Sequence, residues 1–222
     1  MEYLDIRDEE GKPTGQIKAR EEVHRDGDLH GTSHVWIVRK KPMPEQGGRP
    51  EAPGAGDLQG QSGETSREHS GEQGGLSREE EKLSAYEILL QKRSRNKDAY
   101  PGCYDISSAG HILAGDDFLP AACREVREEL GLEISPDELI LAGTMQYRFV
   151  RQFHGKPFDN HEISAVYLCM KDVDTDKLVL QEEEVESVKW MGFMQCMEKA
   201  KKKDPQFCIQ EQELRMIADY IV

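Results

Sequence analysis

Three glutamates form the most chemically suggestive group in this sequence. Glu125, Glu128 and Glu129 lie three and four residues apart in the segment GHILAGDDFLPAACREVREELGL, residues 110–132. Residues with this spacing share one face of an α-helix, so the carboxylates are expected to project together. A hard divalent cation such as Mg²⁺ or Mn²⁺ would relieve their repulsion, because it takes oxygen ligands and keeps positions for water and substrate phosphates. A solvated acidic helix face is the alternative, and the glycines and arginine spaced around the glutamates favour the metal site.

Local signals define the ends of the helix that would carry these carboxylates. Asp116 or Asp117 suits the N-cap, Pro120 is tolerated in a first turn, and Gly131 suits the residue just past the C-terminal end. Arg124 lies four residues before the second glutamate, so we expect an ion pair that fixes this carboxylate.

The same segment resembles the Nudix box, the signature of the Nudix hydrolases. Gly, five residues, an acid, seven residues and then REVREELGL reproduce every fixed position but one, since Asp116 stands where the family has Glu. The resemblance implies that Gly110, through its carbonyl group, joins Glu125, Glu128 and Glu129 in holding the metal. It also implies that the cofactor, Mg²⁺ or Mn²⁺, serves the hydrolysis of a diphosphate bond.

Composition and charge narrow the class of protein. The chain has 222 residues, of which 36% are hydrophobic, enough for one domain with a core and a disordered segment. Its net charge of −14 argues against a nucleic acid polymer as partner but allows a small phosphorylated substrate in a pocket with local basic residues. No apolar run is long enough for a membrane span, and the N-terminus is too acidic for a targeting peptide. Five cysteines without a CxxC pair indicate a reduced compartment, so we expect a cytoplasmic protein; a homodimer is compatible with the sequence.

Residues 43–83 break the pattern of apolar residues. Nine of the twenty glycines lie between Gly47 and Gly75, and the whole stretch lacks Val, Ile, Phe, Tyr and Trp. Such a composition cannot bury enough apolar surface to offset its ordering entropy. We therefore predict a single domain over residues 1–222 with a disordered Gly/Glu/Ser-rich insertion at 43–83, whose last residues, SREEEKL, form a turn or two of helix.

The remaining residues alternate between strand and helix patterns. We predict a hairpin over residues 1–17, strands over 32–40 and 85–93 that pair across the insertion, and a strand over 104–112 that leads into the acidic helix. An antiparallel pair over 139–152 and 161–170, a strand over 185–191, and helices over 193–203 and 206–222 follow. Mixed strands with helices on both sides predict an α/β (α+β) fold, a Nudix-type α/β/α sandwich with a mixed β-sheet.

Outside the insertion, nearly the whole chain resembles the isopentenyl-diphosphate isomerase-like branch of the Nudix superfamily. The resemblance is carried by GKPTGQIKAREEVHRDGDLHGTSHVWI, by LLQKRSRNKDAYPGCYDISSAGHILAGDD, and by MQYRF and NHEISAVYL. It implies one divalent metal on a set of positions that match here as His24, His30, His111, Glu129 and Glu162. Where the helix carboxylates hold the metal instead, the first two histidines would bond to backbone or line the pocket.

Two departures from the isomerases change the expected chemistry. Asn160 stands where they have a metal-binding Glu, which weakens that site, and Ala109 stands where they have the catalytic Cys. Alanine has no proton to exchange with a carbon atom. The isomerases also lack the full Arg-Glu-x-x-Glu-Glu set that this chain carries. We therefore expect isomerase architecture with hydrolase chemistry.

Basic residues near the box are candidates for phosphate binding. The resemblance places the substrate diphosphate on Arg93 and Lys97, with a further basic contact from Arg20. Arginine suits a bidentate phosphate contact and lysine a point-charge contact, whereas the alternative is a solubilising basic turn. His111 is expected to face the active centre and substrate, and His34, inside a strand, to be structural.

The expected activity is hydrolysis of a diphosphate linkage in a nucleoside diphosphate or a nucleoside diphosphate-X compound, by a Nudix pyrophosphohydrolase. The attacking water would lose its proton to Glu128, Glu129 or Glu162, and the sequence does not choose among them. The resemblance implies that the acidic run at residues 181–184 is a place where many Nudix hydrolases have an extra Glu, and a solvated loop is the simpler expectation. Candidates for stacking on a base are Trp36, Tyr100, Tyr104, Tyr147 and Phe149. An isopentenyl-diphosphate delta-isomerase-like enzyme and a non-catalytic Nudix-fold binding module remain the alternatives.

Overall fold

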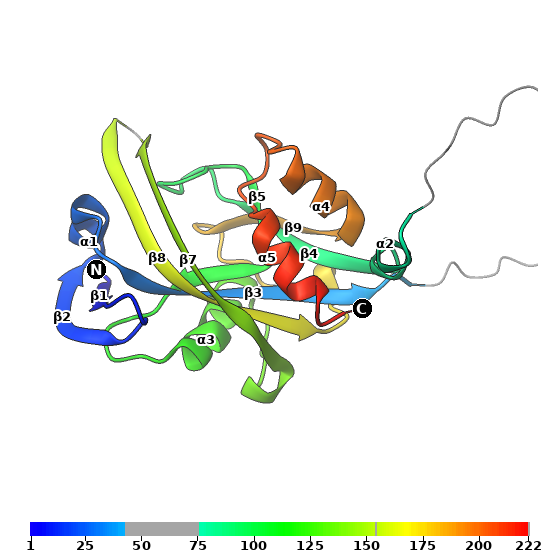
Figure 1. Cartoon of the computed structure of the whole chain (residues 1–222), viewed down its shortest axis with the longest axis horizontal. Coiled ribbons are helices and arrows are strands. Elements are labelled where there is room, and N and C mark those ends of the chain that lie inside the picture. The colour runs from blue at the N-terminus through cyan, green and yellow to red at the C-terminus, as the bar shows by residue number, and fades with distance from the viewer. Residues whose placement is uncertain (43–75, 154, 222) are drawn as a thin grey trace, which may run out of the picture.

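A computed structural model of the chain describes residues 1–42, 76–153 and 155–221 (Figure 1). The strands are β1 (Tyr3–Arg7), β2 (Pro13–Ala19), β3 (His30–Lys40), β4 (Tyr86–Arg93), β5 (Tyr104–Asp105), β6 (Ser108–His111), β7 (Leu139–Phe153), β8 (Lys156–Met170) and β9 (Val185–Gly192). The helices are α1 (Arg20–Asp26), α2 (Arg78–Leu83), α3 (Phe118–Leu130), α4 (Phe193–Lys201) and α5 (Glu211–Ala218), with short 3-10 turns at Pro136–Glu138 and Thr175–Lys177. None of the helices in these ranges has the length and apolar character needed to cross a membrane.

β3 is the central strand of a nine-stranded mixed sheet. It runs parallel to β8, from the pair His30 and Glu162 to the pair Val38 and Met170, and antiparallel to β1, β4 and β6. β7 extends the sheet beyond β8, and β5 and β9 both pair with β4. The hairpin end of β7 and β8 projects beyond the other strands (Figure 1). The predicted pairing of β3 with β4 across the insertion is confirmed.

Alternation along β3 divides the core into two layers. Trp36 and Val38 point to one face, where they pack with apolar residues of α4 and α5. Val35 and Ile37 point to the other face, where they pack with apolar residues of α3. Figure 1 accordingly shows α3 and α4 on opposite sides of β3. The expected α/β/α sandwich with a mixed sheet is confirmed.

The predicted strand over residues 104–112 is divided into β5 and β6. At the break, the Ser107 hydroxyl donates to the carbonyl of Leu89 at 2.6 Å and accepts from the backbone N–H of Ile37 at 2.8 Å. A buried side chain thus replaces the ladder hydrogen bonds of the two neighbouring strands. The break turns the chain so that β6 leaves β4 and pairs with β3 instead.

The predicted helix over residues 206–222 is shorter, because only Glu211–Ala218 is helical. Residues 206–208 instead run beside β5, where Tyr104 N–H donates to the carbonyl of Gln206 at 2.7 Å and Cys208 N–H donates to the carbonyl of Tyr104 at 3.0 Å. These bonds satisfy backbone groups that a helix would otherwise pair internally.

The end of the predicted insertion belongs to the folded part of the chain. Arg78–Leu83 forms α2, which begins with a capping box between Ser77 and Glu80, so the predicted turn of helix is confirmed. Leu83 is 4% exposed and packs in the core layer under α4. The prediction of disorder is therefore wrong for residues 76–83, since a buried leucine anchors them. For residues 43–75 it lies outside the described residues.

Candidate active site

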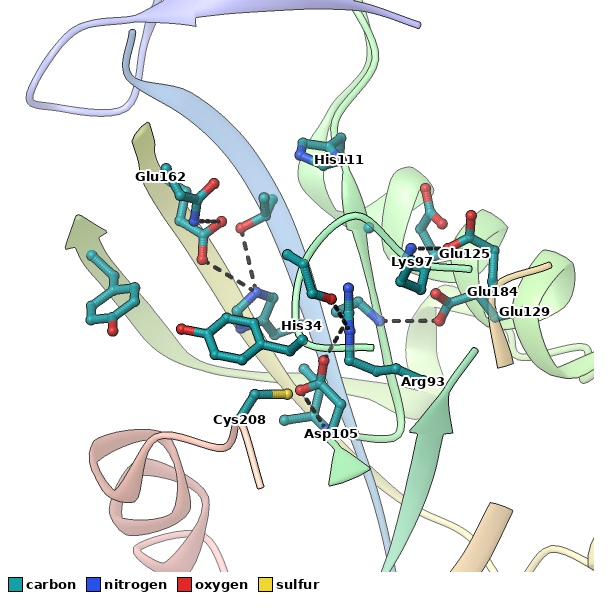
Figure 2. Close-up of a pocket in the computed structure, with 18 of the residues that line it drawn as sticks. His34, Arg93, Lys97, Asp105, His111, Glu125, Glu129, Glu162, Glu184 and Cys208 are labelled. Carbon is teal, nitrogen blue, oxygen red and sulfur yellow. Dashed lines mark hydrogen bonds and ion pairs between the residues drawn. The ribbon is translucent and has the colours of Figure 1, made fainter. Parts of the chain in front are cut away.

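A cavity gathers nine of the residues predicted to act in metal binding, substrate binding or catalysis, whereas His30, also implied as a metal position, is not among its lining residues. It is lined by Arg20, Arg93, Lys97, Gly110, His111, Glu125, Glu128, Glu129 and Glu162. Figure 2 shows Glu125, Glu129, Glu184 and Lys97 at one side and Glu162 with His34 at the other, while Arg93 and Asp105 lie between them. The sequence thus predicted which side chains meet, although their roles stay predictions.

The carboxylates of α3 reach the cavity because the helix packs closely on β6. A Cβ atom at Gly110 would overlap with Cγ, Cδ and Oε2 of Glu125, so only glycine leaves room for this side chain. The glutamate side chains differ in exposure: Glu125 is 14% exposed and Glu128 46%, while Glu129 is buried. The helix ends, as expected, at a left-handed Gly131 with φ of 63°.

The buried carboxylates carry raised pKa values. Burial raises the pKa of Glu129 to about 7, and the charge of Glu125 adds to the effect. The backbone N–H of Ala109 donates to Glu129 Oε2 at 3.2 Å and opposes this shift. Burial also raises the pKa of Glu125, with a further contribution from the charge of Glu128. A bound divalent cation would favour the charged forms, so this set of oxygen donors fits Mg²⁺ or Mn²⁺.

Arg124 holds the carboxylate face together. Its Nη1 lies 3.1 Å from Glu128 Oε2, which confirms the predicted ion pair, and 2.7 Å from Glu125 Oε1. Its Nη2 donates to the carbonyl of His111 at 3.1 Å. Asp116 Oδ2 stops 4.0 Å from Arg124 Nε, a buried atom without a hydrogen-bond partner in the described parts of the chain. Asp116, which is shorter than the Glu usual at this position of the motif, therefore contributes less to holding the Arg124 side chain in place.

The basic residues line the cavity, and each has an acidic partner. Arg93 Nη1 donates to Asp105 Oδ2 at 2.8 Å, and Arg93 Nε donates to the carbonyl of Ala99 at 3.0 Å. Lys97 Nζ pairs with Glu184, and burial together with the charge of Arg93 lowers the pKa of Lys97 to about 8. The run at residues 181–184 is therefore more than a solvated loop, because its last glutamate reaches the cavity.

Arg20, at the start of α1, has its Nη1 2.9 Å from Glu2 Oε2, and both residues line the cavity. It thus brings a third cation to the carboxylates from the N-terminal part of the chain. Arg95, in contrast, is 82% exposed and pairs with Glu186 away from these groups. Of the basic residues in the turn after β4, some line the cavity, whereas Arg95 does not.

Three histidines form a second cluster of possible metal ligands. Nitrogen atoms of His24, His30 and His111 all lie within 4.8 Å of one another. Nε2 of His24 and Nε2 of His30 are buried and find no hydrogen-bond partner among the residues that the structure describes. Burial lowers the pKa of His24 to about 3 and also lowers that of His111, so these rings are neutral. Neutral imidazoles with free nitrogen atoms fit a borderline cation such as Zn²⁺.

Glu162 lies beside this histidine cluster but is held by an amide. Asn160 Nδ2 donates to Glu162 Oε2 at 2.9 Å. The residue that replaces a carboxylate of the isomerases therefore supports the neighbouring carboxylate by a hydrogen bond. Asn160 thus offers a hydrogen bond that positions Glu162, in place of a charged metal ligand.

His34 differs from the expectation of a purely structural residue, since its side chain lines the cavity. Its Nδ1 lies 3.1 Å from both carboxylate oxygens of Glu213, on α5. Although burial opposes the shift, Glu213 raises the pKa of His34 to about 9. No motif marks this pair, because its members are 179 residues apart.

Other lining residues were only partly indicated by the sequence. Tyr100, Tyr147 and Phe149 line the cavity, as does Phe158, which no pattern marked. Trp36 is fully buried and, like Tyr104, belongs to the core layer under α4 and α5. Strand alternation predicts that a side chain faces one side of a sheet, but not whether a helix or a cavity covers that side.

Comparisons with known proteins agree with this geometry. Residues 76–209 match the model of the NUDIX domain. Nudix hydrolase 3 of Arabidopsis thaliana is 33% identical over 208 residues, which are 93% of this chain and 21% of the plant protein. An "Uncharacterized Nudix hydrolase" of Clostridium acetobutylicum is 31% identical over 185 residues, 83% of this chain and 66% of the bacterial protein. The chain thus spans about a fifth of one relative and about two thirds of the other.

Two further similarities concern the isomerase branch and the fold. Isopentenyl-diphosphate Delta-isomerase of Escherichia coli is 30% identical over 104 residues, 47% of this chain and 51% of the isomerase. The crystal structure of DR0079 from Deinococcus radiodurans is 15% identical, covers 99% of both chains and gives a TM-score of 0.55, which shows a shared fold. The Arabidopsis thaliana and Clostridium acetobutylicum relatives are both named as Nudix hydrolases. Because the family model matches more than half of its residues, this chain belongs to the Nudix family.

Proposed function

We propose that this protein hydrolyses a diphosphate linkage in a nucleoside diphosphate or nucleoside diphosphate-X compound, with Mg²⁺ or Mn²⁺ as cofactor. One observation carries the proposal: the carboxylates of α3 share a cavity with the cations Arg93 and Lys97. Oxygen ligands for a metal and basic groups for phosphate oxygens are the two requirements of metal-assisted diphosphate cleavage. The names of the relatives support the same class of reaction.

One group of residues would bind the metal, and another would bind the phosphates of the substrate. Glu125, Glu128 and Glu129, with the carbonyl of Gly110, would hold the cation, which when bound supplies charge neutralisation at the phosphate oxygens. Arg93 offers a planar fork for bidentate contact with a phosphate, and its own position is fixed by an acidic partner on β5.

Lys97 would add a point charge, and Arg20 a further guanidinium contact, at the same diphosphate group. Their acidic partners, Glu184 and Glu2, hold them toward the cavity before the substrate arrives. The proton of the attacking water passes to Glu128, Glu129 or Glu162, the carboxylates that the cavity offers as a base.

Substitution of the carboxylates tests this assignment. Purified protein with Mg²⁺ is incubated with a panel of nucleoside diphosphate compounds, and the products are followed by phosphorus NMR. Glu129→Gln should lose most of the turnover and keep the fold, because it preserves shape but removes a charged ligand. Full activity in this variant would show that α3 does not hold the metal. Comparing Glu128→Gln with Glu162→Gln then separates the candidate bases, since loss of the base lowers kcat across the pH range.

An isomerase of isopentenyl diphosphate is the second candidate, favoured by the cluster of His24, His30 and His111. The same incubation with isopentenyl diphosphate tests it, and an isomerised product would establish it. Ala109 argues against this activity because it supplies no acid or base. The intact carboxylates of α3 argue against a non-catalytic binding module.

Several expectations from the sequence remain proposals alongside this function. They are one domain over residues 1–222, a homodimer, and a cytoplasmic location. Analytical ultracentrifugation tests the dimer, and fractionation of cells tests the location.

A further inference from the structure

Tyr100 lies in the loop between β4 and β5, and its backbone adopts a conformation that few residues other than glycine take. Its φ of 49° falls in the left-handed region, where the Cβ atom is crowded by the following carbonyl oxygen. Such strain persists only where the surrounding structure holds the residue in place. The contacts of Tyr100 therefore show what fixes this loop.

The side chain of Tyr100 packs on the end of the β7–β8 hairpin that projects from the sheet (Figure 1). Its ring centre lies 5.8 Å from that of Phe149 and 5.5 Å from that of Phe153, both in edge-to-face geometry. The guanidinium carbon of Arg151 lies 5.1 Å from the centre of the Tyr100 ring. The three partners are two residues apart along β7, so they share one face of the strand, and their aromatic and cation–π contacts stabilise the strained residue.

The backbone next to Tyr100 holds Arg93 in the cavity. The carbonyl of Ala99 accepts a hydrogen bond from Arg93 Nε at 3.0 Å, and Asp105 Oδ2 accepts one from Arg93 Nη1 at 2.8 Å. Together these two bonds fix the plane of the guanidinium group. A shift of the loop at Tyr100 would therefore move the Ala99 carbonyl and turn the guanidinium group away from its present direction.

The same loop carries Lys97, three residues before Tyr100. The Lys97 side chain is 15% exposed and pairs with Glu184, so it points into the cavity rather than to solvent. The base of the loop is closed by the backbone N–H of Arg93, which donates to the carbonyl of Cys103 at 2.9 Å. The loop is thus fixed at its base by the sheet and in its outer part by Tyr100, and the position of Lys97 depends on both.

We propose that Tyr100 is a positioning residue: by packing on the end of the β7–β8 hairpin, it holds Arg93 and Lys97 where they bind the phosphate groups of the substrate. The hairpin end therefore supports the phosphate-binding cations through the loop, although these cations lie on a different part of the sheet. The inference rests on the proposed function, because that function places the substrate diphosphate at these two cations. It differs from the expectation that Tyr100 stacks on a base, since a positioning role needs no ring in the ligand.

Binding of a probe without a ring tests the proposal and needs no turnover. The probe is methylenediphosphonate, which resists cleavage and cannot stack on an aromatic side chain, titrated by calorimetry with Mg²⁺. Tyr100→Asn removes the aromatic ring, whereas asparagine tolerates the left-handed backbone, so the variant isolates the contacts with the hairpin. It should weaken the probe by roughly tenfold, about the effect of losing one hydrogen bond to a charged group. Tyr100→Phe keeps the ring and should restore wild-type affinity.

Substitutions on the hairpin test the same contacts from the other side. Phe153 touches Tyr100 but is not among the cavity-lining residues that the structure describes, so Phe153→Ala removes a contact of the ring without removing one to the probe. It should weaken methylenediphosphonate in the same direction as Tyr100→Asn. Val150→Ala is the matched control, because Val150 is 66% exposed and lies on the other face of β7; its affinity should equal that of the wild-type protein. The double variant of Tyr100→Asn with Lys97→Met should lose less than the product of the two single losses, because both substitutions act on the same phosphate contact.

The outcomes separate this proposal from the hydrolase proposal. Weaker probe binding in Tyr100→Asn and Phe153→Ala, with wild-type Mn²⁺ affinity in the absence of the probe, supports the positioning role. Unchanged probe affinity in Tyr100→Asn overturns it, and so does an equal loss of Mn²⁺ affinity, which would show general damage to the cavity. A wild-type protein that does not bind methylenediphosphonate overturns both the positioning role and the placement of the diphosphate at these cations. Phosphorus NMR of the wild-type protein with nucleoside diphosphate compounds reports separately whether hydrolysis occurs.

Discussion

Gly110→Ala is the substitution whose effect follows most directly from the geometry. The added methyl group would overlap with three atoms of Glu125, each well inside the 3.4 Å at which ordinary van der Waals contact begins. The carboxylate or the helix must therefore shift by on the order of 1 Å. Because the overlapping atoms belong to the flexible side chain of Glu125, which can rotate away, the loss of unfolding free energy should stay near the lower end of the roughly 1–3 kcal/mol typical of overpacking. In a chain of this size, a loss of about 1 kcal/mol lowers Tm by roughly 2–4 °C.

The effect on metal binding and turnover should exceed the effect on stability. A misplacement of this size at a reacting centre costs on the order of 10²-fold in rate. We expect Gly110→Ala to lower kcat/KM by about that factor and to weaken Mn²⁺ binding, measured by calorimetry on the metal-free protein. The Mn²⁺ titration needs no substrate, so it reports on the site even before the substrate is known.

Gly192→Ala provides the matched control. Gly192 has an ordinary φ of −56°, and a Cβ there would meet its nearest neighbour at 3.6 Å. This control should keep wild-type Mn²⁺ affinity and kcat/KM, with any loss confined to the cap of α4. If Gly110→Ala matches the control in metal affinity and turnover, the packing of Glu125 on β6 does not set the metal site.

Three further measurements address charge, core boundaries and the cofactor. Because the pKa of Lys97 is lowered to about 8 by burial and by the charge of Arg93, wild-type KM should rise about tenfold per pH unit above pH 8. In Lys97→Arg, the side chain at position 97 stays charged because the usual pKa of arginine is far above this range, so KM should not change between about pH 7.5 and 9.5. An equal rise of KM in the wild-type protein and the variant would contradict the role of Lys97. Leu83→Ala should cost about 2–5 kcal/mol in chemical denaturation, whereas Leu76→Ala, at a residue 55% exposed, should change stability by less than about 0.5 kcal/mol. Removal of metal by EDTA should abolish diphosphate cleavage, and added Mg²⁺ or Mn²⁺ should restore it; cleavage that survives chelation would argue against the cofactor.

Local sequence signals were sufficient where each structural feature depends on neighbours in the chain. The acidic helix follows from residues spaced three and four apart, and its end from Gly131. The pairing of β3 with β4 follows from two apolar runs on either side of a polar stretch, since a long insertion at a hairpin tip costs little closure entropy. The backbone N–H of Lys41 donates to the carbonyl of Ala85 at 2.8 Å, so the flanks of that stretch meet as expected.

The ion pairs that the sequence did not predict join residues that lie far apart in the chain. Glu213 is the only acid of α5 that is buried in the described structure, and its charge is balanced by His34, a residue of β3. Arg93 is similarly held by Asp105, whose pKa it lowers although burial opposes this. Such pairs leave no periodic trace, because each side chain follows the ordinary alternation of its own element. A charged residue in a strand or helix pattern therefore cannot be assigned to a cavity until the elements that cover it are known.

The contacts of Ala109 support the proposal of hydrolysis over that of isomerisation. Its backbone N–H supports Glu129, and its side chain lines the cavity without an exchangeable proton. Moving a proton to or from carbon requires an acid or base placed beside that carbon, and alanine removes it from this position. Hydrolysis requires a polarised phosphate, a water molecule and one carboxylate base, and in the proposed reaction the glutamates of α3 and β8 would supply the ligands and the base. The position that would serve carbon chemistry in the isomerases therefore contributes, in this chain, a backbone donor to the carboxylate set of the proposed hydrolase.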